Sequence, residues 1–121
     1  MSAIAIADPA TGKLVEGESI ADLGGLAIAY AAYHKSLQGK PQPKDIDGFT
    51  PDQRFFLGYA QSWEDNMRPE YARMLTNLDP HPLPKFRVLG PLSNLPAFAR
   101  AFGCKAGDPM VRPPADRCTI W

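Results

Sequence analysis

The sequence predicts one mainly α-helical domain over residues 1–121, with about four helices joined by proline-rich connectors. Three observations lead to this prediction. A length of 121 residues suits one small domain. Apolar side chains recur at helical spacing in separate segments. The 13 prolines, about twice the average usage, gather in the second half, where they favour short helices and stiff connections.

The overall composition excludes some classes of partner. The formal net charge is zero and the sequence pI is about 6.7, which argues against a nucleic-acid partner held by phosphate neutralisation. No apolar run is long enough to span a membrane. Residues 1–9 lack the basic start of a signal peptide. We therefore expect no nucleic acid and no membrane segment in this chain.

The first helix is expected from about Gly17 to Leu37, after a loose leader over residues 1–13 with a turn at residues 8–12. Gly39 is its stop signal. One face of this helix is apolar and carries Ile20, Leu23, Ala27, Tyr30 and His34. We expect His34 to be an ordinary packed or surface residue.

The start of this helix carries two acids and two glycines. Glu18 and Asp22 are four residues apart and share a face. Gly24 and Gly25 each cost a helix roughly 1 kcal/mol relative to alanine, which favours close approach of another backbone. The simpler alternative is a solvated acid pair that complements the helix dipole.

The second helix has the clearest start in the sequence, after an exposed loop over residues 40–48. Thr50 is a favoured N-cap, Pro51 suits the first helical position, and Gln53 completes a capping box. A wide aromatic face follows and consists of Phe55, Phe56, Tyr59 and Trp63. We expect this helix to end near Asn66.

A third, short helix is expected from Pro69, with Tyr71, Met74 and Leu78 buried. Alternating prolines over residues 79–84 then predict a stiff, extended segment. Residues 86–89 are expected to continue extended, as a possible short strand.

A fourth helix is expected after an Asn94 N-cap, with Pro96 in its first turn and Gly103 at its end. Its apolar face consists of Leu95, Phe98 and Phe102. The tail from residue 104 is expected to be irregular. A disulfide, pairing with another chain, and buried thiols all remain open for Cys104 and Cys118.

Three side chains near residue 80 are candidates for chemistry. Histidine as a side-chain type can donate or accept a proton, and Asp79 is placed to orient the ring of His81, so this pair suits donation to a developing oxyanion. The alternative is a loop pair without function. Arg87 is suited to clamp a carbonyl or carboxylate, or else to form a structural salt bridge to Asp79 or Asp22.

No complete catalytic set is present in the sequence. The motifs HExxH, CxxC and GxSxG are all absent. A catalytic zinc needs three protein ligands and an open position. The residues alone nominate one oxygen ligand.

Three blocks of the sequence, taken together, resemble one known family. They lie at Gly12–Leu26, which contains GESIADLGGL, at residues 55–63 with 68–71, and at residues 79–104 with a close at 117–121. The chain resembles the C-terminal part of the neprilysin/endothelin-converting-enzyme family of zinc metallopeptidases, whose first block is GENIADxGGL. The resemblance covers nearly all of residues 11–121, so it implies the C-terminal helical segment of a zincin-type (gluzincin) catalytic domain.

The resemblance implies a role for five residues. Glu18 matches the third zinc ligand, and Asp22 matches the acid that orients a zinc-bound histidine. His81 matches the residue that hydrogen-bonds the tetrahedral intermediate, and Asp79 matches its orienting acid. Arg87 matches the arginine that binds the backbone carbonyl of the substrate.

Two departures from the family pattern matter. The HExxH helix, with two zinc ligands and the general base, is absent from the sequence, so we expect a C-terminal fragment that is inactive alone. Glu64 follows Trp63 where animal members often have a cysteine, so no family pairing can be assigned to Cys104 or Cys118.

The expected function is that of a zinc metalloendopeptidase hydrolysing peptide bonds, with this chain as one part of it. The expected partners are the peptide substrate and the remainder of the catalytic domain. We expect the faces of Ile20, Tyr30, Phe55 and Phe56 to be partly uncovered, which favours self-association, for example as a homodimer.

Two alternatives remain, a non-catalytic helical interaction module derived from a peptidase and a subunit that completes a zinc site with another chain. The compartment is unknown from this chain. The resemblance implies a periplasmic, secreted or membrane-anchored protein.

Overall fold

The computed structural model describes residues 9–120, and within them the fold is mainly helical, as predicted. The helices of this part of the chain are α1 (Pro9–Leu14), α2 (Glu16–Ser36), α3 (Pro51–Gln61), α4 (Pro69–Leu78), α5 (Pro84–Asn94), α6 (Pro96–Ala101) and the 3₁₀ helix η1 (Pro114–Asp116). Across residues 9–120 no strand forms, although an isolated β-bridge joins Ile46 to Phe49.

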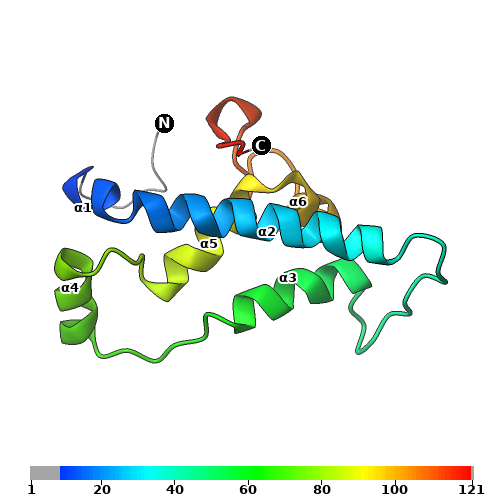
Figure 1. Ribbon diagram of the computed structural model, residues 1–121, viewed down its shortest axis with the longest axis horizontal. Coiled ribbons are helices and arrows are strands. Elements are labelled where there is room, and N and C mark those ends of the chain that lie inside the picture. Colours follow the sequence, from blue (N-terminus) through cyan, green and yellow to red (C-terminus); the bar gives the residue numbers. More distant parts are fainter. Residues whose placement is uncertain (1–8, 121) are drawn as a thin grey trace.

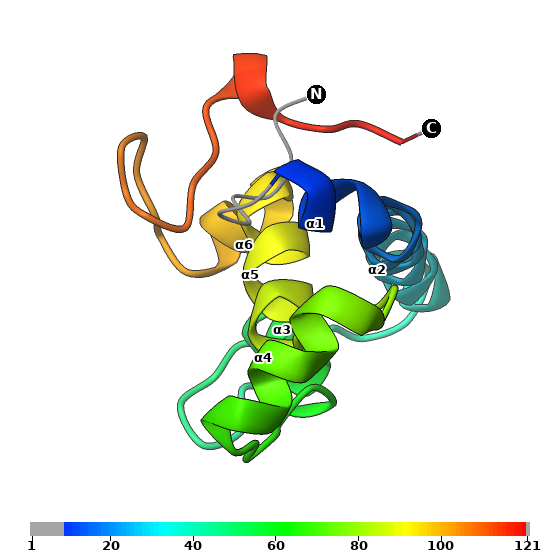
Figure 2. The ribbon, with the colours of Figure 1, turned by 90° about the vertical axis from the view of Figure 1, so that its left-hand side faces the viewer.

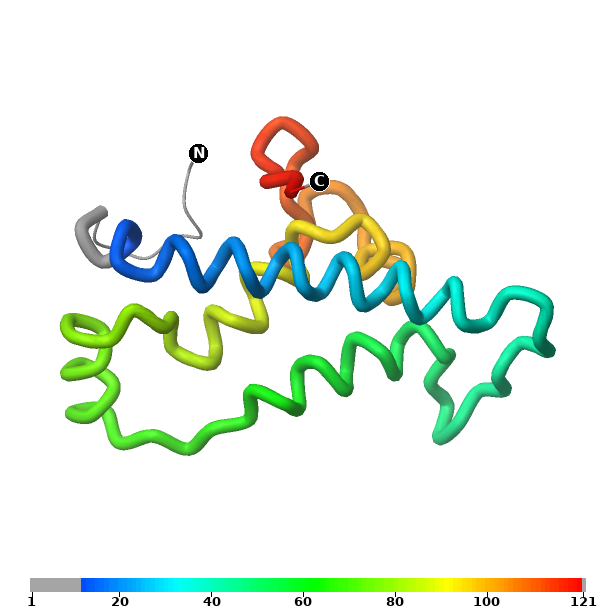
Figure 3. Tube along the Cα trace, in the orientation of Figure 1, coloured from blue at the N-terminus to red at the C-terminus, as the bar shows by residue number. Residues whose placement is uncertain are grey.

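Helix α2 is the longest helix, and the other helices are arranged along it (Figure 1). The chain turns back after α2, and α3 then runs beside it in the reverse direction (Figure 3). Seen nearly end-on, α2 lies on one side, with α5 and α6 on the other (Figure 2). This arrangement brings the start of α2 next to the start of α5. Within residues 9–120 no helix is both long and apolar enough to cross a membrane.

The core lies where α2, α3, α5 and α6 meet. Leu26, Phe56, Leu92 and Ala97 are its buried residues. Phe56 is completely buried, so the expectation that it is partly uncovered is wrong, whereas Ile20 remains 44% exposed as expected. Tyr30 and Phe55 are half-buried at the edge of this core.

The start of the chain differs from the expected loose leader. Residues 1–8 lie outside the described part, but α1 begins at Pro9, where a turn was expected. Proline is favoured in the first turn of a helix because its φ is already helical and its missing N–H has no partner there anyway. Helix α2 then extends from Glu16 to Ser36, within one residue of the predicted bounds.

Helix α3 confirms the predicted capping box. The Thr50 hydroxyl accepts from the Gln53 N–H at 3.2 Å, and the Gln53 side chain accepts from the Thr50 N–H at 2.9 Å. The helix ends at Gln61, however, and not near Asn66. The Ser62 hydroxyl donates to the Tyr59 carbonyl at 2.6 Å, which satisfies the last turn there.

Helix α4 has the predicted start, but its apolar side chains are not buried. Tyr71, Met74 and Leu78 are 51%, 47% and 74% exposed. The helix projects from one end of the molecule (Figure 1), so its apolar face has little of this chain to pack against.

The predicted extended segment over residues 86–89 is wrong, because these residues lie inside α5. Pro84 occupies the first helical position and starts the helix, so it acts here as a helix initiator. Asn94 also differs from its predicted role as an N-cap, since it ends α5, and Leu95 caps α6.

Asn94 is instead buried, and its side chain connects α5 to the tail through hydrogen bonds. Its amide donates to the Gly90 carbonyl at 2.8 Å, and its carbonyl accepts from the Cys118 N–H at 3.0 Å. The tail is irregular apart from η1, as predicted. Cys104 and Cys118 are both free thiols and partly buried.

Candidate active site

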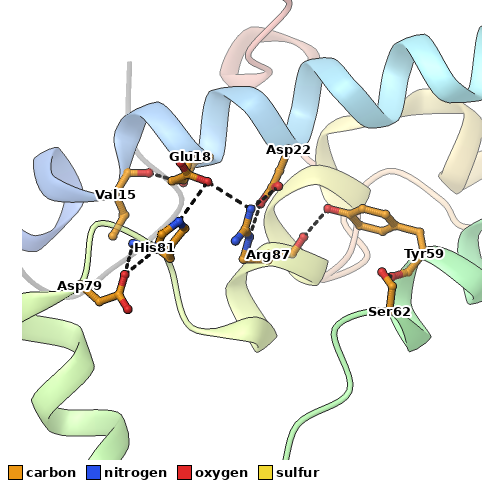
Figure 4. A network of polar contacts seen from close by, with 9 residues as sticks. Val15, Glu18, Asp22, Tyr59, Ser62, Asp79, His81 and Arg87 are labelled. Atoms are coloured by element: carbon orange, nitrogen blue, oxygen red, sulfur yellow. Dashed lines mark hydrogen bonds and ion pairs between the residues drawn. The ribbon is translucent and has the colours of Figure 1, made fainter.

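The five residues singled out from the sequence lie together (Figure 4). Glu18 and Asp22 come from the first turns of α2, Asp79 and His81 from the connector before α5, and Arg87 from α5. Arg87 contacts Asp22 and Glu18 across 65 and 69 residues of sequence. The close packing of α2 against α5 brings them together.

Arg87 and Asp22 form a two-pronged ion pair. Nε of Arg87 lies 2.7 Å from Oδ2 of Asp22, and Nη2 lies 2.7 Å from Oδ1. The two side chains are only 13% and 10% exposed. This hydrogen bonding to Asp22 raises the pKa of Arg87 above its ordinary value. The salt-bridge alternative for Arg87 is therefore correct in its geometry, with Asp22 and not Asp79 as the partner.

Two further groups hold Arg87 from the end of α3. The Arg87 Cζ atom lies 3.9 Å from the centroid of the Trp63 ring, a cation–π contact. The Tyr59 hydroxyl donates to the Arg87 carbonyl at 2.8 Å. Burial first, and then the charge of Asp22, raise the pKa of Tyr59 to about 12.

Asp79 holds His81 through both its backbone and its ring. Oδ1 of Asp79 lies 2.6 Å from Nδ1 of His81 and accepts from the His81 backbone N–H at 2.9 Å. The backbone bond first, and then the ring contact, lower the pKa of Asp79 below its usual value. Asp79 therefore contacts the ring at Nδ1, and its orienting role stays a prediction.

The far edge of the His81 ring faces Glu18. Nε2 of His81 lies 3.7 Å from Oε2 of Glu18, and Nη2 of Arg87 lies 3.3 Å from the same oxygen. The Glu18 side chain is 39% exposed. Glu18 is therefore the acid of the pair that remains accessible, while both oxygens of Asp22 are engaged by Arg87.

The chemistry of these residues fits one part of a zinc site. Glutamate oxygen is an ordinary zinc ligand, and a carboxylate can accept several contacts at once. Within residues 9–120 no group of three or more His, Cys, Asp or Glu side chains is placed to hold a metal ion. Glu18 therefore fits as a single ligand, and a zinc ion held there needs its other ligands from elsewhere.

Other predicted residues lie away from this cluster. His34 is 47% exposed and pairs with Asp52, with Nε2 and Oδ1 3.0 Å apart. Gly24 is buried. A Cβ atom at Gly25 meets no described atom outside its own helix backbone within 4 Å, so residues 9–120 do not supply the close backbone approach expected there.

Sequence reasoning missed the contacts of Tyr59 and Trp63 with Arg87. Both were identified as buried aromatic residues of one helix face, four residues apart. No local spacing rule connects them to Arg87, which lies 28 positions after Tyr59 and 24 after Trp63. Only the packing of α3 against α5 shows the contact.

Comparisons with known proteins connect this geometry to a family. The sequence model of Peptidase family M13 matches residues 2–118. An endothelin-converting enzyme homolog of Locusta migratoria is 43% identical over 112 residues, which are 91% of this chain and 15% of that protein. Membrane metallo-endopeptidase-like 1 of Mus musculus is 47% identical over 107 residues, which are 87% of this chain and 14% of that protein.

A solved structure is also similar. The zinc metalloprotease Zmp1 of Mycobacterium tuberculosis, in complex with an inhibitor, matches with a TM-score of 0.85 and 44% identity. The match covers 91% of this chain and 17% of that one. The chain spans about 15% of the length of the curated relatives that it matches. The chain belongs to Peptidase family M13.

Proposed function

We propose that this chain is the C-terminal part of the catalytic domain of a zinc metalloendopeptidase, which hydrolyses peptide bonds. The observation that carries the proposal is the convergence of Glu18, Asp22, Asp79, His81 and Arg87 from three separate segments, in a chain of family M13. A structural salt bridge accounts for Arg87 and Asp22, but it does not account for a histidine held by an aspartate and directed at an accessible glutamate.

Glu18 is the zinc ligand of this chain in the proposal. Its carboxylate is accessible, and Arg87 and His81 both approach the same oxygen, Oε2. Zinc, when bound, supplies a Lewis acid and an activated water. The remaining ligands and the base belong to the remainder of the catalytic domain, since the 121 residues contain no HExxH. The chain alone is therefore expected to be inactive.

Asp22 acts through its neighbours. Both of its oxygens accept from Arg87, and each keeps a second lone pair for another donor. A zinc-bound histidine of the remainder of the domain is a suitable donor, because an orienting carboxylate fixes the tautomer of such a ligand. Asp22 then connects the metal side of the site to Arg87.

His81 is the proposed transition-state donor. Because Asp79 occupies Nδ1, the Nε2 edge is the part of the ring left for the substrate. In the imidazolium form this edge donates a hydrogen bond to the oxyanion that develops on the scissile carbonyl. The His81 side chain is 52% exposed, so a peptide has access to it.

Arg87 is the proposed substrate-binding residue. A guanidinium carries five N–H groups and keeps its charge. The contacts with Asp22 and Glu18 use Nε and Nη2, which fix the plane of the group. A peptide carbonyl that reaches this plane accepts from a donor that is already oriented, so little side-chain entropy is lost on binding.

The remainder of the catalytic domain is the proposed main partner. Ile20, Ile28 and Leu78 are 44%, 56% and 74% exposed, and apolar side chains of this kind mark surfaces that are covered in an assembly. The alternative is that the same side chains serve a non-catalytic interaction module or a homodimer.

A chimera of a whole relative tests the proposal. Residues 12–121 of this chain replace the matching segment of Zmp1, and hydrolysis of a peptide is measured. We expect an active chimera in which His81→Gln lowers kcat by about 10²- to 10³-fold, as loss of an oxyanion donor does, with little change in KM.

The matched control is His34→Gln, which changes the other histidine of the chain and should leave kcat unchanged. A chimera that is active but insensitive to His81→Gln contradicts the proposal. A folded, zinc-loaded chimera without activity also contradicts it and favours the interaction module.

A further inference from the structure

We propose that Trp63 is a positioning residue for Arg87. The face of its indole ring holds the Arg87 guanidinium in the plane in which it pairs with Asp22 and reaches Glu18. The value of this restraint for substrate binding rests on the function proposed above for Arg87. The restraint itself is a property of this chain.

The Arg87 guanidinium is contacted both along its edge, by carboxylates, and on its face, by an aromatic ring. Asp22 accepts two hydrogen bonds from the edge of the guanidinium, at 2.7 Å each, and Glu18 accepts a longer one at 3.3 Å. Trp63 covers a face, with Cζ of Arg87 3.9 Å from the ring centroid. Edge contacts alone allow the group to tilt about the line of its hydrogen bonds. A ring against the face prevents this tilt.

Trp63 is itself held by the turn that ends α3. Its backbone N–H donates to the Ala60 carbonyl at 3.1 Å. Its ring meets the Tyr59 ring edge-on, with centroids 6.4 Å apart and an interplanar angle of 74°. A side chain fixed in this way offers a defined surface to its neighbour.

The same stretch of α3 also holds the backbone of Arg87. The Tyr59 hydroxyl donates to the Arg87 carbonyl at 2.8 Å, one helical turn before Trp63. Tyr59 therefore fixes the position of the residue along α5, and Trp63 fixes the orientation of its charged group. The end of α3 and the turn after it determine both, although within residues 9–120 neither Tyr59 nor Trp63 forms a hydrogen bond with Glu18 or Asp22.

The exchange of the Arg87 Nε–H with water measures this restraint in the full 121-residue chain. The signal is observed by ¹⁵N NMR and assigned by its loss in Arg87→Lys. We expect Trp63→Leu, which has no ring, to speed this exchange by roughly fivefold, the factor that an ordinary cation–π contact supports. Trp63→Phe, which keeps a ring face, should restore most of the protection.

Two comparisons separate orientation from general loosening. Phe55→Leu removes a ring from the same helix at a site away from Arg87, and should leave the Arg87 Nε–H exchange unchanged. The backbone amides of α5 report on the fold. If they accelerate as much as the Arg87 signal does in Trp63→Leu, Trp63 is merely structural and the proposal is wrong.

If Trp63→Leu does not fold, fluorinated tryptophan in place of Trp63 tests the same proposal. Fluorine weakens the attraction of the ring face for a cation with little change in size, so the Arg87 Nε–H exchange should rise stepwise with each fluorine. No dependence on fluorine content overturns the proposal. Since neither experiment uses zinc or a substrate, a failure here is distinct from a failure of the peptidase function.

Discussion

Replacing Arg87 with methionine removes the cation that two carboxylates share. The side chains of Arg87 and Asp22 are 13% and 10% exposed, so most of this ion pair is shielded from water. Breaking a buried ion pair at one end leaves an uncompensated charge and costs about 3–5 kcal/mol. The loss of the Trp63 contact adds to this cost, while packing by the methionine side chain reduces it. We expect Arg87→Met to lower the free energy of unfolding by about 3 kcal/mol.

This magnitude is large for a domain of this size, because total stabilities are about 5–15 kcal/mol. The assay is urea unfolding at pH 7, followed by circular dichroism. The midpoint should fall, and the thermal midpoint should drop by on the order of 10 °C. The matched control is Arg73→Met on α4, an exposed arginine, where we expect a change within about 0.5 kcal/mol.

A double variant tests the reason for the loss. Asp22→Leu combined with Arg87→Met removes both charges, and buried pairs replaced by apolar residues are often near neutral. The double variant should therefore be more stable than Arg87→Met alone. If Arg87→Met behaves like Arg73→Met, or if the double variant is no more stable than the single one, the reasoning about a desolvated pair is wrong.

Three further predictions concern single residues. The pKa of Asp79 lies below its usual 3.8, so its ionised form stabilises the fold above about pH 4, and this stability is lost as the pH falls through the lowered pKa. Asp79→Asn should therefore lower the urea midpoint at pH 7, and this loss should shrink toward pH 2 as the folded-state carboxyl takes up a proton. Gly25→Ala should raise the thermal midpoint, by about 0.5–1 kcal/mol of stability, because within residues 9–120 an added methyl meets nothing beyond its own helix backbone within 4 Å, and alanine favours the helix. Tyr30→Phe should cost about 1–2 kcal/mol in urea unfolding, because its hydroxyl donates to the Asp52 carboxylate at 2.7 Å.

Matched controls accompany these three variants. Asp65→Asn changes an exposed acid and should have the same small effect at both pH values. Gly39→Ala should destabilise, opposite in sign to Gly25→Ala, because Gly39 has a φ of +71°. Tyr71→Phe changes an exposed phenol and should be neutral. Equal effects of a variant and its control contradict the corresponding prediction.

Local signals in the sequence predicted the helices that begin with clear caps. The capping box at Thr50 and the first-turn prolines at Pro51 and Pro69 fixed the starts of α3 and α4. Pro84 carries the same signal, but the alternating prolines before it favour an extended chain that continues through residues 86–89, where the structure has a helix. Proline at a first helical position and proline in an extended connector are alike locally, so packing of α5 on α2 decides between them.

The burial predictions failed where packing with other parts of the chain decides burial. The apolar spacing in α4 is real, yet Met74 and Leu78 stay 47% and 74% exposed within the described residues. Periodicity shows that a helix has an apolar face, but it does not show which partner covers that face. Phe56 and Tyr71 have similar sequence contexts and opposite burial for this reason.

The candidate site was predicted in its parts but not in its connections. The four-residue spacing predicted that Glu18 and Asp22 share a helix face. The prolines around His81 predicted that it is held close to Asp79. The ion pair between Arg87 and Asp22 joins residues that are 65 positions apart in the sequence. Only the alternative of a structural salt bridge predicted it. The roles of these residues in catalysis stay proposals.

The zinc content of the Zmp1 chimera tests the central claim most directly, because the claim is that Glu18 supplies a metal ligand. Glu18→Gln keeps the size of the side chain but removes the carboxylate, and Glu16→Gln makes the same change two residues earlier on the same helix, at an exposed acid. Bound zinc is measured by elemental analysis after dialysis against a weak chelator. We predict one zinc per chimera, retained in Glu16→Gln and lost in Glu18→Gln. Equal retention of zinc in the two variants would contradict the assignment of Glu18 as a ligand.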